Sequence, residues 1–250
     1  MTAMIRAELL KLRRQRPVMA LAVVLSAGAV VAFQAYIQIR HVTTTSPQVF
    51  GPAGGEAGMD QLLKMQGLYF GSLAAILVGA EAGTADLTSG VFRDLVATGR
   101  SRLTLFWVRL PAALIVSVGF TALAYVIGVI GLFVYADGLM TPSFGQILDG
   151  LGWVLLANGA VTALTLGLGC LTGSRALTLT GLIGWQTVGQ LLLIHEIKNP
   201  VFLLTTGLAR FAPTPVTQAH LSELAAAGVI AAWILIPMLA GARRTLTQDA

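Results

Sequence analysis

The sequence predicts an all-α integral membrane protein with six transmembrane helices and an amphipathic interfacial helix at its N-terminus. Of the 250 residues, 56% are hydrophobic and only 11% are charged, whereas a soluble domain carries roughly 25% charged residues. The mean hydropathy is +0.80, and the apolar residues gather in blocks of the ~20 residues that one membrane crossing requires. About six such blocks fill the chain. Residues 1–250 are therefore expected to form one transmembrane domain, with no room for a soluble catalytic domain.

Residues 3–16 form the first expected element, a short basic helix. Ile5, Leu9 and Leu12 fall on one helical face. The basic side chains fall largely elsewhere on the helix, namely Arg6, Lys11, Arg13 and Arg14. This pattern is typical of a helix that lies on the anionic cytoplasmic leaflet. Pro17 then turns the chain into the bilayer, at a position where a helix start tolerates proline.

Six spans follow, separated by segments that carry turn-forming residues. The predicted spans are residues 18–39, 62–82, 105–135, 147–171, 176–194 and 221–240. Gly79-x-x-x-Gly83 is a helix-packing signal at the end of the second span, and Thr172-Gly173-Ser174-Arg175 predicts a tight turn before the fifth. The segment 195–220 is only partly apolar and contains three prolines. It is expected to be a re-entrant or interfacial extracytoplasmic segment, although its prolines fit an ordinary loop equally well.

The positions of the basic residues predict the orientation of the chain. Twelve of the sixteen lie in segments that the six spans place on one side of the membrane. By the positive-inside rule, this side is the cytoplasm, and it holds both termini and the 83–104 loop. The rule also accounts for the net charge of +5, so nucleic acid is not expected as a partner.

Enzymatic chemistry is not expected from this chain. The three histidines, His41, His195 and His220, have no neighbouring His or Cys at metal-ligand spacing. Neither a protease or hydrolase motif nor a P-loop is present, so we expect no metal and no cofactor on this chain. The middles of the spans carry no Asp, Glu, Lys or Arg, which argues against a proton or sodium relay and against a secondary active transporter.

Polar residues within the spans allow two interpretations. Several share helical faces in the first, fourth and fifth spans. They are Gln34 and Gln38, then Asn158, Thr162 and Thr165, then Gln186 and Gln190. They could form hydrogen bonds between helices, worth ~0.6–2 kcal/mol each, or they could line a path for a substrate.

The segment from Glu81 to Arg109 carries the strongest functional signal. It is the longest polar, arginine-bearing stretch between two apolar blocks. Phe92 and Leu95 could fill an apolar pocket on a partner, and the nearby arginines could pair with carboxylates there. The alternative is that the arginines only enforce the orientation of the chain.

This segment resembles the loop signature of the ABC-2 type permeases, the membrane subunits of type V ABC exporters. Asp86 matches the acidic position of that signature, Gly90 its glycine, Ser101-Arg102 its Ser-Arg turn, and Arg109 the basic residue that starts the next span. The sequence departs from the pattern by Asp in place of Glu, Val91 in place of Thr, Gly99-Arg100 where Pro is common, and Arg109 in place of Lys.

The resemblance implies a permease that works as a homodimer with two copies of a separate ABC ATPase subunit. ATP and Mg²⁺ would bind to the ATPase. A cytoplasmic coupling helix within residues 86–102 would contact it. The residues implied in this contact are Asp86, Gly90, Phe92, Arg93, Leu95, Arg100, Arg102 and Arg109. The expected function is export of a drug, antibiotic or lipid-like compound across the bacterial inner membrane.

Two other functions remain open at this point. A membrane scaffold or sensor could use the same loop to recruit a cytoplasmic partner without transporting anything. A membrane-embedded enzyme that acts on lipids would depend instead on His195, Glu196, Arg210 or His220.

Overall fold

The structure of the chain is a computed structural model, and it describes residues 2–43, 51–88, 90–91, 96–97, 99–189, 201–214 and 221–247. The regular structure in these residues is all helical. The α-helices are α1 (Thr2–Arg14), α2 (Arg16–Val23), α3 (Ala29–Thr43), α4 (Gly55–Leu63), α5 (Phe70–Thr88), α7 (Arg102–Val134), α8 (Phe144–Thr172), α9 (Arg175–Gly184), α11 (Leu204–Arg210) and α12 (Glu223–Thr247). Three π-helical segments join consecutive helices or extend one: η1 (Val24–Gly28), η2 (Lys64–Tyr69) and η3 (Trp185–Gly189).

Within the described residues, five helices are long and apolar enough to cross a membrane. They are Arg16–Thr43, Gly55–Asp86, Arg102–Val134, Phe144–Thr172 and Glu223–Thr247. These ranges agree with five of the six predicted spans. The predicted span 176–194 is described only as far as Gly189, in α9 and η3, and stays a prediction. The described part of the chain is thus all helical, and the chain has the features of a multi-pass membrane protein.

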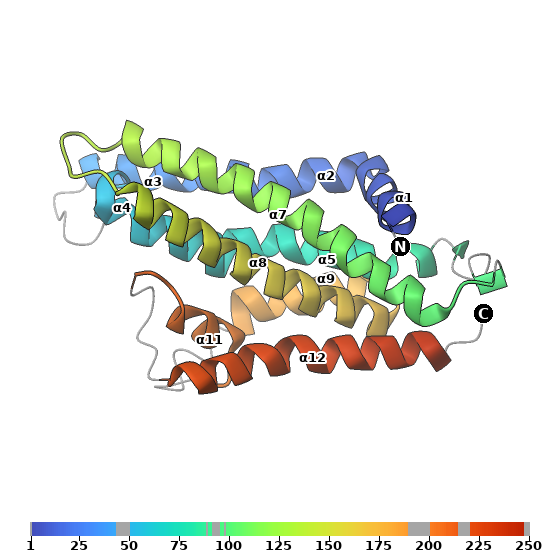
Figure 1. Cartoon of the computed structure of the whole chain (residues 1–250). Helices are drawn as coiled ribbons and strands as arrows, with labels where there is room; N and C mark the ends of the chain where they lie inside the picture. Colours follow the sequence, from blue (N-terminus) through green and yellow to red (C-terminus); the bar gives the residue numbers. More distant parts are fainter. Residues whose placement is uncertain are drawn as a thin grey trace.

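The long helices lie side by side as a bundle with two distinct ends (Figure 1). One end holds α1, the start of α7, the start of α9 and the end of α12, and we call it the terminal end. The other end holds the start of α4, the start of α8 and α11, and we call it the distal end. The described members of the larger basic group, such as Arg14, Arg175 and Arg243, lie on the elements of the terminal end.

Two of the five long helices form the centre of the bundle. In the helix from Gly55 to Asp86 and in α8, 72% of the most apolar window is buried, against 22–33% in the other three. The outer helices are also the more apolar ones, because a helix that faces lipid must present hydrocarbon to it. The central helices contact protein, so they can carry small and polar residues.

Small residues let the two central helices approach each other closely. A Cβ atom added to Gly79 would lie 2.7 Å from the Thr162 carbonyl oxygen, and one added to Gly83 would lie 2.7 Å from that of Leu166. The predicted packing role of Gly79-x-x-x-Gly83 is therefore confirmed. The predicted tight turn is confirmed as well, since Gly173 ends α8 in the left-handed conformation (φ 68°) and Ser174 caps α9.

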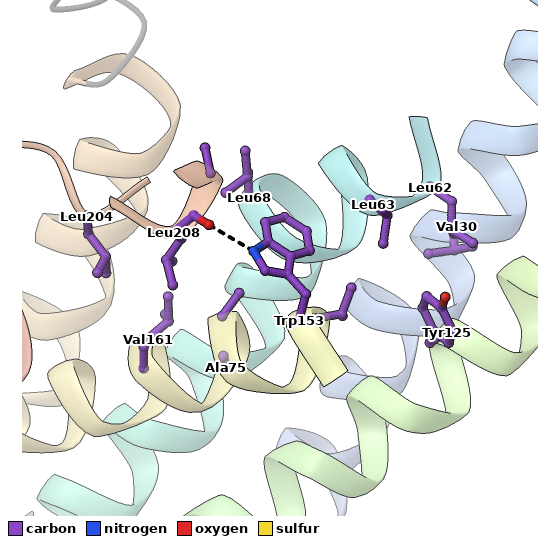
Figure 2. Packing of buried hydrophobic residues seen from close by; sticks show 14 of the residues in the cluster. Val30, Leu62, Leu63, Leu68, Ala75, Tyr125, Trp153, Val161, Leu204 and Leu208 are labelled. Carbon is purple, nitrogen blue, oxygen red and sulfur yellow. Dashed lines mark hydrogen bonds between the residues drawn. The ribbon is translucent and has the colours of Figure 1, made fainter. Parts of the chain in front are cut away.

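A buried tryptophan ties α11 to the centre of the bundle. Trp153 on α8 is 4% exposed, and its indole N–H donates to the Leu208 carbonyl at 2.8 Å. Figure 2 shows this bond beside the packed side chains of Leu68 and Leu204. Of the predicted re-entrant segment 195–220, residues 201–214 are described. They include α11, and part of α11 is buried inside the bundle. Residues 195–200 and 215–220 lie outside the described residues.

The structure corrects two expectations at the terminal end. The second helix continues to Thr88 instead of giving way to a loop at residue 83, because the small side chains after Ala82 pack against α8 and the charge of Asp86 is neutralised there. The apolar face of α1 packs into the bundle, with Leu12 only 2% exposed and Ile5 and Leu9 against the same core. The apolar face of α1 therefore packs against the protein, whereas contact with lipid was expected.

Candidate functional site: a charge network at the terminal end

Asp86 and Arg109 form an ion pair inside the bundle. Asp86 lies in the last turn of α5, and Arg109 lies two turns into α7. Arg109 Nη2 donates to Asp86 Oδ2 at 2.7 Å, and the two side chains are 1% and 3% exposed. A buried charge that loses its partner costs a protein about 3–5 kcal/mol. The pair therefore holds the end of α5 against the start of α7.

Helix α1 joins this pair through a lysine. Lys11 Nζ lies 2.5 Å from Asp86 Oδ1 and 2.8 Å from Glu8 Oε1. Both oxygens of Asp86 are thus engaged, one by α1 and the other by α7. Glu8, Lys11, Asp86 and Arg109 carry two formal charges of each sign, so the network is neutral as a whole.

Cys170 extends the contact to α8. Arg109 Nη1 lies 3.7 Å from Cys170 Sγ, and the thiol donates to the Gly83 carbonyl at 3.3 Å. The thiol thus bonds to α5 and α7 at the point where both helices meet α8. Four helices, α1, α5, α7 and α8, are connected within this one network.

A second ion pair lies one turn away on α5. Glu81 is 4% exposed, and its Oε2 lies 2.9 Å from Arg175 Nη1 at the start of α9. The geometry of this contact is that of an ion pair without a hydrogen bond. It connects α5 to α9 in the way that Asp86 connects α5 to α7.

The structure separates the eight predicted coupling residues into groups. Asp86 and Arg109 are buried and bind each other within the chain, and their contact with a partner stays a prediction. Gly90 and Arg100 are exposed, and Arg102 is half-buried. The Arg102 Nη1 donates to the Leu246 carbonyl at 3.1 Å.

Three of the predicted coupling residues, Phe92, Arg93 and Leu95, lie outside the described residues. Ser101, from the same signature, caps α7 by accepting a hydrogen bond from the Thr104 N–H.

Most of the predicted polar lining residues make hydrogen bonds within the protein. Gln34 donates to the Gly128 carbonyl at 2.8 Å, and Asn158 donates to that of Gln66 at 2.9 Å. Thr162 bonds to Ser117, and Thr165 bonds within α8. These four side chains are buried, which favours the interpretation as contacts between and within helices.

The remaining members of the polar set lie nearer the edge of the bundle. Gln38 accepts a hydrogen bond from the Ala53 N–H at 3.3 Å. Gln186 is half-buried in η3 and donates to the Leu68 carbonyl in η2, while Gln190 lies outside the described residues. The bond from Gln186 therefore connects two π-helical segments, and such segments occur frequently at functional sites.

Sequence reasoning missed the partners in the charge network. Lys11 was interpreted as a residue that faces lipid headgroups, and Glu81 and Cys170 received no role. A signal for Glu81 was available, because it lies at the end of the predicted span 62–82 and an acidic residue within a span requires a partner. The identity of that partner was not readable, since Arg175 lies 94 positions along the chain.

The network suits mechanical connection better than bond chemistry. Both oxygens of Asp86 and the thiol of Cys170 already contact neighbouring groups. Within the described part of the chain, no group of three or more His, Cys, Asp or Glu side chains could hold a metal ion. What the arrangement does in the structure is hold α1, α5, α7 and α8 together through short contacts.

Searches against family models, curated proteins and solved structures return no match for this chain.

The thiol of Cys170 provides a direct measurement of this site. It is 1% exposed and is the single cysteine of the chain. In the purified protein we expect a maleimide to react with it roughly a hundredfold more slowly than in denaturant, because labelling requires α5, α7 and α8 to separate. The rate can be followed with a fluorogenic maleimide, and equal rates in buffer and denaturant would contradict the described packing.

Proposed function

We propose that this chain is the transmembrane permease subunit of an ATP-driven ABC exporter. It works as a homodimer with two copies of a separate ATPase subunit, which binds the ATP and Mg²⁺. The observation that carries the proposal is the ion pair of Asp86 and Arg109, which lies between the two helices that lead into and out of the 89–101 segment. Two residues of the permease-like signature, Asp86 and Arg109, thus meet in space at the base of the segment that would bind the ATPase.

This arrangement supports a mechanism for coupling. An ATPase that moves the 89–101 segment would move α5 and α7 together, because the ion pair joins them. Lys11 would carry the movement to α1, and the close contact of Gly79 and Gly83 with α8 would carry it to the centre of the bundle. Rigid elements joined by short contacts are the means by which a displacement reaches a distant site.

The expected substrate is a hydrophobic or amphipathic compound, such as a drug, antibiotic or lipid-like molecule, taken from the cytoplasm or the inner leaflet. The chain would lie in a bacterial inner membrane with both termini in the cytoplasm. The crowding of basic residues at the terminal end supports this orientation. The large unburied faces of α7 and α12 supply surface for lipid and for a second permease chain.

The proposal is tested by purifying the tagged chain from its native membrane and identifying the proteins that accompany it. A stoichiometric subunit with a P-loop is the expected result. Recovery of the chain alone, under extraction that preserves a known ABC complex, would contradict the exporter. Recovery with a partner that lacks a P-loop would favour the scaffold instead.

Two arginines next to the loop should matter for the partner and little for the fold. Arg100 is exposed, and Arg102 lies at the start of α7. Replacing both by Ala should weaken ATPase binding by about tenfold, because charged pairs at an interface rim mainly steer association. Binding and permease-stimulated ATP hydrolysis are measured with purified subunits.

The matched control for this pair is Arg210→Ala. Arg210 is an exposed arginine at the distal end, where it pairs with Glu223 at 3.2 Å. A partner at the terminal end cannot reach it, so the control should retain full stimulation. Equal stimulation by the Arg100/Arg102 variant and by the control would remove the coupling role from these two arginines.

A further inference from the structure

The distal end of the bundle contains a cavity of 570 Å³. It lies between the start of α4, the segment before α8 and the first turns of α8. The lining residues are Glu56, Ala57, Met59, Asp60, Leu139, Met140, Gln146, Asp149, Pro213 and Thr214. Pockets for small molecules are typically ~300–1,000 Å³, so the cavity is large enough for a drug-sized compound.

Three carboxylates give the cavity a negative charge. Glu56 and Asp60 come from α4, and Asp149 comes from α8. Among the residues that the structure describes, none of the three belongs to an ion pair. Uncompensated charge of one sign in a concave site attracts ligands of the opposite sign.

The rest of the lining is largely apolar. Met59, Leu139, Met140 and Pro213 contribute hydrocarbon and thioether surface. Methionine side chains adapt their shape to different ligands. A ligand with a positive charge and an apolar part would therefore find complementary surface for both.

Hydrogen bonds hold the rim of the cavity in place. Gln146 Nε2 donates to Glu56 Oε1 at 2.5 Å, while Gln146 Oε1 accepts from the Ser143 N–H at 2.7 Å. The Glu56 N–H donates to the Met140 carbonyl at 2.7 Å. These bonds connect α4, α8 and the segment between α7 and α8. The rim is therefore largely formed before a ligand arrives, which lowers the entropic cost of binding.

The arrangement of the carboxylates indicates the kind of ligand. In the described residues, these carboxylates form no group of three that could hold one metal ion, so their charge is spread along the wall. This spread of charge fits an extended organic ligand better than a compact metal ion.

We propose that this cavity binds an amphipathic organic cation. The binding itself requires only the cavity. Its meaning for transport rests on the proposed function: in an exporter with the terminal end in the cytoplasm, the distal cavity is the last site before release outside. The exported compounds would then be cations with an apolar body.

The test uses tetraphenylphosphonium as the probe and tetraphenylborate as its anionic counterpart of the same shape. Equilibrium binding to the purified chain is measured without any ATPase. The variant is Asp60→Asn with Asp149→Asn, which removes two charges while keeping the side-chain shape. The control is Asp137→Asn, because Asp137 is an exposed carboxylate at the same end that does not line the cavity.

We expect the wild-type chain and the control to bind the phosphonium cation and to prefer it over the borate. The double variant should bind it about tenfold more weakly, and salt should weaken binding to the wild-type chain. Equal affinity of the variant and the control, or equal binding of cation and anion, would overturn the proposal. The salt dependence keeps the test decisive if the variant misfolds, since a lack of salt dependence would also overturn it.

Failure of this proposal can be distinguished from failure of the proposed function. If the purified chain binds the cation but no ATPase subunit accompanies it from the native membrane, the cavity proposal is supported and the exporter is contradicted. A stimulated ATPase without cation binding would support the exporter and overturn the cavity.

Discussion

Replacing Asp86 by Asn is expected to lower the free energy of unfolding by about 3–5 kcal/mol, the cost of leaving one member of a buried ion pair without its partner. Arg109 is 1% exposed, so water cannot compensate its charge. For a protein of this size, the thermal midpoint should fall by roughly 10 °C. The midpoint can be followed by the reaction of a fluorogenic maleimide with Cys170, which lies against Arg109.

A double variant separates the loss of charge balance from the loss of the contact itself. Removing both members of a buried ion pair leaves no uncompensated arginine charge at this position, so Asp86→Asn with Arg109→Met should recover much of the lost stability. Asp86→Asn alone should abolish stimulation of the ATPase. A midpoint for Asp86→Asn equal to that of Arg100→Ala, an exposed change at the same end, would show that the pair does not hold the helices together.

Replacing Gly83 by Leu is expected to separate the two central helices. The new Cβ would lie 2.7 Å from the Leu166 carbonyl oxygen and 3.2 Å from the Cys170 backbone nitrogen. Backbone atoms of a packed helix cannot move aside cheaply, so we expect a loss of about 3 kcal/mol, at the upper end of the usual overpacking cost. Cys170 should react faster with maleimide, and the folded yield should fall.

Gly119→Leu is the matched control for this change. Gly119 lies in α7, and a Cβ added there would meet no atom within 4 Å. The same side chain in a helix of the same protein should therefore leave the midpoint nearly unchanged. An equally large effect in the control would mean that loss of a glycine, and not the contact with α8, causes the destabilisation.

Local signals predicted the parts of the fold that depend on neighbours along the chain. Gly173 ends α8 where a tight turn was expected, because only the left-handed conformation closes the helix there. The apolar blocks predicted the long helices for a similar reason, since membrane crossing depends on the length and hydrophobicity of one segment.

Helix boundaries that depend on distant contacts were predicted less well. The second span was expected to end at Ala82, yet α5 continues to Thr88. Polar residues such as Thr84 and Asp86 predict a loop when only their neighbours along the chain are considered. They remain helical because α8 covers the small side chains and because Arg109 and Lys11 neutralise the carboxylate.

For the functional residues too, the local signals were predicted from the sequence and the distant contacts were not. Asp86 and Arg109 were both identified from the sequence, but as two separate points on a surface that would bind a partner. Their contact with each other joins residues 23 positions apart, and the contact of Asp86 with Lys11 joins residues 75 apart. No periodicity in one sequence reports a contact over such separations.

The sequence by itself determined that this chain is helical and has the character of a multi-pass membrane protein, with one polar segment between α5 and α7 that merits a functional test. Those properties follow from local composition, because hydrocarbon solvates apolar side chains and excludes unpaired backbone groups. Only the tertiary structure decided that Asp86 and Arg109 face inward and that Glu56, Asp60 and Asp149 line one cavity. These properties depend on which helices become neighbours, and side chains packed across the whole bundle select those neighbours.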